Sequence, residues 1–247
     1  MVVVGDLFAV VLVKQLFGGI GKNFMNPALA GRAFMFSWAA AMSTWVPAMS
    51  KSPIFLGGVD VVTSATPLTY MANGMLPEGM STLQMFLGNV GGCLGETSAL
   101  ALLIGGIYLC IRKVISPRIP LCYIITVAVL TFIFPLGNNR FDWMLASMFS
   151  GGLFLGAIFM ATDYVTSPVT ARGQLIYGIG CGLLTVFIRY FGSYVEGVSY
   201  SILLMNICVW FLDKTSMGIR FGVSREDKKR AKEAAKAAKK AQKEAAV

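Results

Sequence analysis

Histidine is absent from this chain of 247 residues, and charged residues are scarce. The first absence excludes imidazole metal sites, histidine-ligated haem and a histidine general base within the chain. Only 13% of the residues are charged, about half the share of an average soluble domain. Together with 56% hydrophobic residues and a mean hydropathy of +0.69, this composition indicates an all-α polytopic membrane protein.

Cysteine is also sparse, and its spacing excludes a familiar cluster motif. The five cysteines show no C-x-x-C pair, and four of them lie in apolar segments. This pattern favours small packing residues. The alternative is one cysteine that contributes to a cluster shared with a partner subunit.

The first fourteen residues lack a basic n-region and a small-x-small cleavage site, so they predict a membrane helix and not a signal peptide.

Seven apolar segments predict about seven transmembrane helices, because most approach the ~20 residues that cross the hydrocarbon core. They cover residues 1–17, 26–48, 98–115, 119–136, 143–162, 174–191 and 197–212. Polar, glycine-rich stretches interrupt this pattern at Gly18–Ala30, Gly88–Gly95 and Gly192–Asn206. Such breaks in both halves of the chain predict discontinuous or re-entrant helices in a pseudo-symmetric inverted repeat.

The net charge of +9 is concentrated at the C-terminus. From Lys214 onward the chain carries eleven Lys or Arg and four Asp or Glu. We therefore divide it into a membrane domain, residues 1–222, and a basic Ala/Lys-rich tail, residues 223–247, predicted to be cytoplasmic. A tail of this kind favours contact with anionic lipid, and a membrane body of low charge argues against nucleic-acid binding.

The loop charges, counted back from the tail, assign the other cations to two sides of the membrane. The cytoplasmic side receives Lys14, Lys22, Arg112, Lys113, Arg118 and Arg172. The opposite side receives three isolated cations, Lys51, Arg140 and Arg189. The long polar gap between the second and third apolar segments is thus predicted to be extracytoplasmic.

This gap contains the most distinctive motif of the chain, D-V-V-T-S-A-T-P at residues 60–67. A threonine in this setting resembles the site at which certain bacterial membrane proteins carry FMN through its phosphate. The alternative is a helix cap, since Thr66 followed by Pro67 also suits an N-cap with proline at the first helical position.

Motifs elsewhere in the chain support the first interpretation. They are G-G-I-G-K-N-F-M-N-P-A-L-A-G-R-A-F from Gly18, T-S-A-T-P-L from Thr63, G-E-T-S-A-L-A-L-L-I-G-G from Gly95, A-T-D-Y-V-T-S-P from Ala161 and Y-V-E-G-V-S-Y-S-I-L-L-M-N from Tyr194. Over about residues 5–222 the chain resembles the RnfD component of the Rnf electron-transport complex. It is similar, more loosely, to the NqrB component of the sodium-pumping NADH:quinone reductase.

The resemblance implies a flavoprotein in the bacterial inner membrane. It implies FMN esterified to Thr66 by a separate flavin transferase, with Asp60, Thr63 and Ser64 as recognition or positioning groups. A second, non-covalent flavin such as riboflavin is a further candidate cofactor. Other subunits of the complex would be the partners, and the chain would relay electrons in a machine that moves Na⁺ or H⁺. Family members carry further helices before the position where this sequence begins, so it resembles an N-terminally truncated chain.

Three acidic residues in or beside apolar segments, Glu96, Asp163 and Glu196, are candidates for an ion pathway. A carboxylate at membrane depth is costly and usually faces a polar cavity, although helix capping is the alternative. Arg32 could balance a flavin phosphate, or its side chain could extend toward the cytoplasm.

Two rival functions remain open at this point. One is the NqrB component of the quinone reductase, which belongs to the same superfamily. The other is a channel or transporter for a small solute, which would bind no flavin.

Overall fold

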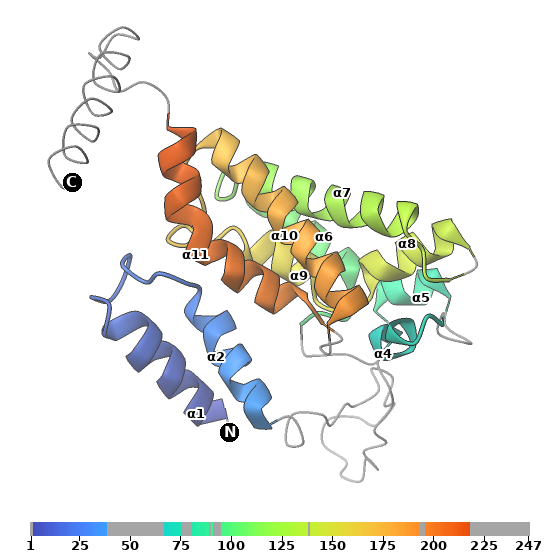
Figure 1. The fold of residues 1–247 in the computed structure, drawn as a ribbon, viewed down its shortest axis with the longest axis horizontal. Helices are drawn as coiled ribbons and strands as arrows, with labels where there is room; N and C mark the ends of the chain where they lie inside the picture. Colours follow the sequence, from blue (N-terminus) through green and yellow to red (C-terminus); the bar gives the residue numbers. More distant parts are fainter. Residues whose placement is uncertain are drawn as a thin grey trace, which may run out of the picture.

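The chain is all-helical wherever this computed structural model describes it, as the composition predicts (Figure 1). The described residues are 2–38, 67–75, 81–88, 90, 95–137, 139–192 and 196–217. The tail at 223–247 and the predicted flavin motif, with Asp60, Thr63, Ser64 and Thr66, lie outside these residues.

Two parallel helices, α7 (Arg118–Ile133) and α10 (Ala171–Phe191), form the centre of the molecule. Their backbones approach closely because glycines of α10 face α7. A Cβ on Gly178 would lie 2.9 Å from the Ile119 carbonyl oxygen, and one on Gly182 would lie 2.6 Å from Thr126 Cβ. Small residues at such contacts are typical of membrane helix pairs.

Helix α11 (Val198–Ser216) runs antiparallel to α10 and covers its other side. A buried group of three hydroxyls joins the helices: Tyr123 Oη of α7 lies 2.6 Å from Thr185 Oγ1 of α10 and 2.9 Å from Ser201 Oγ of α11. The break predicted at Gly192–Asn206 is too long, because α11 begins at Val198 and continues as regular helix past Asn206.

The N-terminal helices form a separate pair beside α11 (Figure 1). The first is α1 (Val2–Leu7), continued as the π-helix η1 (Phe8–Gln15), and the second is α2 (Pro27–Met35), continued as the 3₁₀-helix η2 (Phe36–Trp38). Asn26 begins α2, since its side-chain oxygen accepts hydrogen bonds from the Ala28 and Leu29 amides at 3.0 and 3.3 Å. The predicted break at Gly18–Ala30 is confirmed in its first half: Gly18, Gly19 and Gly21 have positive φ, and α2 then begins at Pro27.

Shorter helices fill the space beside α7 and α10. They are α4 (Pro67–Ala72), α5 (Thr82–Leu87), α6 (Ala99–Ile111), α8 (Arg140–Phe149), α9 (Leu153–Leu155) and the π-helix η3 (Gly156–Met160). The predicted single span at 143–162 is wrong in one respect, because α8 and the α9–η3 segment are bent by 61° at a break.

One described helix, α10, is long and apolar enough to cross a membrane by itself. The bent pair of α8 and α9–η3 would be a second such span, and α6 and α7 are apolar but shorter, with 13 and 16 residues. The predicted count of seven spans and the inverted repeat therefore stay predictions.

Three regions that were assigned to one side of the membrane lie at one end of the described structure. Arg118 at the start of α7 donates to Gln174 Oε1 at 3.4 Å near the start of α10. Asp213 near the end of α11 accepts hydrogen bonds from the Val169 and Thr170 amides, each at 3.2 Å. The relative placement of these loops is thus as predicted, and the compartment that they face stays a prediction.

Candidate functional site

The break between α8 and α9 brings two helix ends together inside the molecule. The last carbonyls of α8 and the first amides of α9 lack partners within their own helices. Gly151 turns the chain between them with a φ of +70°, a conformation that favours glycine. Side chains from distant parts of the chain supply the missing partners.

Arg189, in the last turn of α10, binds the end of α8. Its Nη1 donates to the Ser147 carbonyl at 2.7 Å and its Nη2 donates to the Ser150 carbonyl at 3.2 Å. A cation at this position offsets the negative end of the helix dipole. Arg189, which was predicted as an isolated cation on the side opposite the tail, thus lies within a helix with its guanidinium turned inward, and the side that it faces stays a prediction.

Glu196, just before α11, binds the opposite end of the break. Its Oε1 accepts a hydrogen bond from the Gly152 amide at 3.1 Å. An anion here complements the positive end of α9. A side chain at Gly152 would displace both carboxylates, since an added Cβ would lie 2.6 Å from Glu196 Oε1 and 2.7 Å from Glu96 Oε2.

Arg32 of α2 completes the group. Its Nη2 lies 2.5 Å from Glu196 Oε2 and 3.9 Å from Glu96 Oε2. The carboxylate of Glu96 is the more buried of the two, with 7% of its side chain exposed against 16% for Glu196. We call Arg32, Glu96, Arg189 and Glu196 the break cluster; its two cations and two carboxylates sum to zero formal charge.

The structure thus brings together three of the predicted site residues, Arg32, Glu96 and Glu196. Asp163 lies apart from them. Its Oδ2 accepts a hydrogen bond from Thr166 Oγ1 at 2.9 Å, and its carbonyl accepts one from the Ser167 amide at 3.0 Å. Asp163 thus lies in a turn and not at the start of a helix, and its predicted role in an ion pathway stays a prediction.

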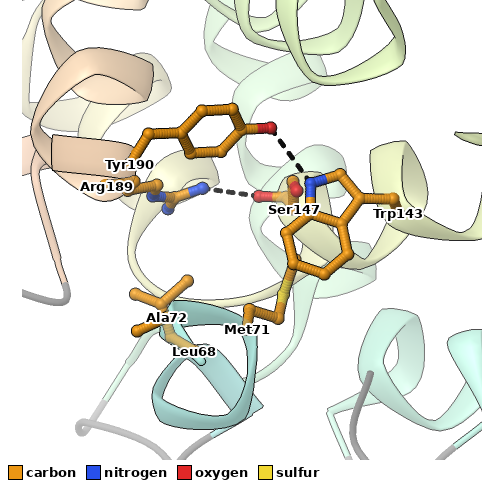
Figure 2. Close-up of a pocket in the computed structure, with 7 residues that line it drawn as sticks. All are labelled: Leu68, Met71, Ala72, Trp143, Ser147, Arg189 and Tyr190. Carbon is orange, nitrogen blue, oxygen red and sulfur yellow. Dashed lines mark hydrogen bonds between the residues drawn. The ribbon is translucent and has the colours of Figure 1, made fainter. Parts of the chain in front are cut away.

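A small pocket with a cavity volume of about 20 Å³ lies on the other side of Arg189. Figure 2 shows the seven residues that line it: Leu68, Met71, Ala72, Trp143, Ser147, Arg189 and Tyr190. Trp143 Nε1 donates to Tyr190 Oη at 3.0 Å, and Tyr190 Oη donates to the Phe134 carbonyl at 2.7 Å. These bonds fix two aromatic side chains beside a guanidinium.

The pocket lies next to the start of α4, which begins at Pro67. Pro67 is bonded to Thr66, the predicted point of flavin attachment, and stands at the first helical position as the capping alternative expects. Aromatic rings and a guanidinium suit an aromatic, anionic ligand in chemical type. The cavity of about 20 Å³ has room for about one water molecule, so in this structure it does not fit a flavin mononucleotide.

Two members of this site escaped prediction from the sequence. Gly152 stands in an S-G-G triplet within an apolar segment, and Arg189 stands in an apolar helix. Both were recognisable signals, because a triplet of small residues permits a break and an arginine at membrane depth needs a partner. Among the described residues, no three His, Cys, Asp or Glu side chains come together as metal ligands.

Comparison with known proteins adds independent information. The sequence profile of the NQR2, RnfD, RnfE family matches residues 1–222. The RnfD component of the Na(+)-translocating ferredoxin:NAD(+) oxidoreductase complex of Acetobacterium woodii is 48% identical, over 93% of this chain and 69% of the relative. Its counterpart in the proton-translocating ferredoxin:NAD(+) oxidoreductase complex of Clostridium ljungdahlii is 42% identical, over 91% and 69%. The counterpart in the ion-translocating oxidoreductase complex of Stutzerimonas stutzeri is 36% identical, over 91% and 70%.

Proposed function

The chain belongs to the NQR2, RnfD, RnfE family, and from this membership we propose that it is the RnfD component of an Rnf-type ion-translocating complex. The observation that carries this proposal is the 48% identity with a relative named as that component of a ferredoxin:NAD(+) oxidoreductase complex. The chain relays electrons between other subunits and is not catalytic alone. All three relatives described above are named as the RnfD component, which favours this assignment over the NqrB component of the quinone reductase.

The proposed setting is the inner membrane of a bacterium. Seven spans in an inverted repeat would hold the break cluster at membrane depth, as discontinuous helices hold the sites of transporters. The C-terminal tail would face the cytoplasm, and Thr66 would face the opposite side. The shared end of Arg118, Gln174 and Asp213 supports this topology, because it gathers the predicted cytoplasmic loops.

The proposed cofactor is FMN, held through its phosphate by Thr66 after the action of a flavin transferase. Bound in this way, FMN would supply one- and two-electron chemistry with its ring system free. Asp60, Thr63 and Ser64 would position the threonine.

The proposed ion step takes place at the break cluster. Buried carboxylates are retained at membrane depth when they serve a pathway. Glu96 and Glu196 approach the same residue, Gly152, and Arg32 lies beside both carboxylates. Moving one charge against about 100 mV costs about 2.3 kcal/mol. Two electrons that fall through about 100 mV release roughly 4.6 kcal/mol, so one or two ions per electron pair are energetically feasible.

The test of the cofactor assignment is in-gel flavin fluorescence under denaturing conditions. Protein made together with its transferase should give a fluorescent band, and Thr66→Ala should abolish it. Thr69→Ala is the matched control, because it removes another hydroxyl three residues away. A band that survives Thr66→Ala would refute the attachment site.

The same gel separates the competing functions. A solute channel would give no fluorescent band from the unaltered protein. The NqrB component of a quinone reductase would give the band, but the assembled complex would then reduce quinone and would not form NADH from reduced ferredoxin.

A further inference from the structure

Both ends of the break between α8 and α9 are occupied by charged side chains of the chain itself. At the end of α8, Arg189 Nη1 lies 2.7 Å from the Ser147 carbonyl oxygen (Figure 2), and its Nη2 lies 3.2 Å from that of Ser150. At the other end, Glu196 Oε1 accepts a hydrogen bond from the Gly152 amide at 3.1 Å. The broken helix thus holds one tethered cation and one tethered anion.

Helix ends of this kind bind free ions in other membrane proteins. In transporters with discontinuous helices, carbonyls at the C-terminal end of a half-helix coordinate Na⁺ or H⁺, and the N-terminal end of another binds an anionic group of the substrate. In this chain the Arg189 guanidinium stands at the carbonyls, and the Glu196 carboxylate stands at the amide. The chain has therefore filled with its own side chains the positions that a free cation and a free anion would take.

A metal cation at the break would need oxygen atoms that are already bonded. Na⁺ is held by several oxygens at once, because they must replace its hydration shell. The two helix-end carbonyls are bonded to Arg189, while the two oxygens of Glu196 are bonded to the Gly152 amide and to Arg32. With these four oxygens taken, Na⁺ could use them only by displacing a guanidinium or an amide.

Two fixed positive charges also flank the carboxylates. Arg32 Nη2 lies 2.5 Å from Glu196 Oε2 and 3.9 Å from Glu96 Oε2. Arg189 approaches from another side, since a Cβ on Gly151 would lie 3.4 Å from its Nη2 and 3.9 Å from Glu196 Cγ. Both guanidiniums repel a further cation that needs a wide shell. A proton differs, because it forms an O–H bond with a single carboxylate oxygen.

We propose that Arg189 is a specificity-determining residue of the break cluster, which occupies the carbonyls that a metal cation would need and so makes the exchanged ion a proton. Glu96 takes the proton, since both oxygens of Glu196 are already bonded. An O–H bond forms on Glu96 when the proton enters from one side, and the same bond breaks when the proton leaves toward the other. No electron is transferred at the cluster. This inference rests on the proposed function, which places the ion step here and leaves the ion open.

The experiment uses membrane vesicles that contain the assembled complex. Electron transfer is measured as NADH formed from reduced ferredoxin and NAD⁺, and ion movement is measured with a pH-sensitive dye and with ²²Na⁺. The unaltered complex should give the dye response in K⁺ buffer without Na⁺, and any ²²Na⁺ uptake should disappear when a protonophore is added. Glu96→Gln should abolish the dye response. Asp142→Asn should keep it, since this control removes a carboxylate from the opposite end of α8.

Arg189→Gln tests the specificity role directly. The change frees the Ser147 and Ser150 carbonyls, so ²²Na⁺ uptake that resists the protonophore should rise about tenfold per NADH, the effect of about one bond to a charged group. Arg189→Lys should give a smaller rise, because an ammonium keeps the charge but cannot bind two carbonyls in a fixed fork. Arg140→Gln is the matched control, since it removes the same charge from an exposed position at the start of α8 and should leave the ion preference unchanged.

Two results would overturn the inference. One is protonophore-resistant ²²Na⁺ uptake by the unaltered complex that Glu96→Gln abolishes, because the cluster would then carry Na⁺. The other is an unchanged ion preference in both Arg189 variants. Failure of both variants to assemble counts equally against it, because Arg189 would then act in folding alone.

Failure of the proposed function gives a different pattern. In that case the unaltered complex would move neither ion during electron transfer, or Glu96→Gln and Glu196→Gln would both leave ion movement unchanged. If the unaltered complex moves Na⁺ and Glu96→Gln abolishes this movement, the proposed ion step stands and only the assignment of the proton is refuted.

Discussion

Replacing Arg32 with glutamine tests whether the break cluster is held by its charges. Arg32 Nη2 lies 2.5 Å from Glu196 Oε2 and 3.9 Å from Glu96 Oε2, so the change leaves two largely buried carboxylates without their cation. Removing one partner of a buried ion pair costs about 3–5 kcal/mol. Because 22% of the Arg32 side chain is exposed, we expect the lower end, about 3 kcal/mol of unfolding free energy.

Replacing the other partner of the ion pair, Glu196, should cost less unfolding free energy. In Glu196→Gln the amide oxygen can still accept the hydrogen bond from Gly152, and Arg32 keeps Glu96 as a nearby anion. We expect a loss of about 1–2 kcal/mol for this variant. The double variant should lose less unfolding free energy than the sum of the two single losses, with a coupling energy of about 2 kcal/mol. The reason is that the second substitution removes a side chain whose ion-pair partner is already gone.

The assay is equilibrium unfolding in mild detergent with rising SDS, followed by tryptophan fluorescence. Arg118→Gln is the control, since its exposed bond to Gln174 should contribute no more than about 0.5 kcal/mol. A coupling energy below about 0.5 kcal/mol would refute the reasoning, because the pair would then act as two independent side chains.

Two further predictions use the same assay. Gly152→Ala should destabilise the protein by about 1–3 kcal/mol, because the new methyl group would lie 2.6 Å from Glu196 Oε1. Gly105→Ala is its control, where the nearest side-chain atom is a phenylalanine ring carbon at 3.2 Å, and equal losses in both would contradict the argument. Tyr123→Phe should cost about 1–2 kcal/mol, because it removes the hydroxyl that joins α7 to α10 and α11. Tyr108→Phe, with an exposed ring, should change stability by less than about 0.5 kcal/mol, and a similarly small effect at Tyr123 would show that the three-hydroxyl group contributes little.

The apolar segments were predictable because helix formation in a membrane depends on local composition. The predicted segment at 174–191 corresponds to α10, and that at 119–136 corresponds to α7. Family membership was also predictable, since the motifs that carry it are continuous in sequence. The comparisons confirm this part, with a family match over residues 1–222.

The bend at Ser150–Gly152 was not predictable in the same way. A triplet of small residues is compatible with a straight membrane helix and with a break. The outcome depended on whether distant groups could satisfy the freed carbonyls and amides. Arg189 and Glu196 do so here, and only the packing of α10 and of the start of α11 beside the break places them there.

The sequence alone determined that this is an apolar helical chain, to which family it belongs, and which of its few charges stand in apolar surroundings. Tertiary structure alone decided that Glu96 and Glu196 meet at Gly152 with Arg32 beside them, while Asp163 accepts a hydrogen bond from Thr166 in a turn elsewhere. The physical reason is that the cost of burying a charge is set locally, by the apolar residues around it. The packing of whole helices determines which residue becomes the partner of a buried charge. That partner can be distant in the sequence, as Glu196 is 164 residues from Arg32.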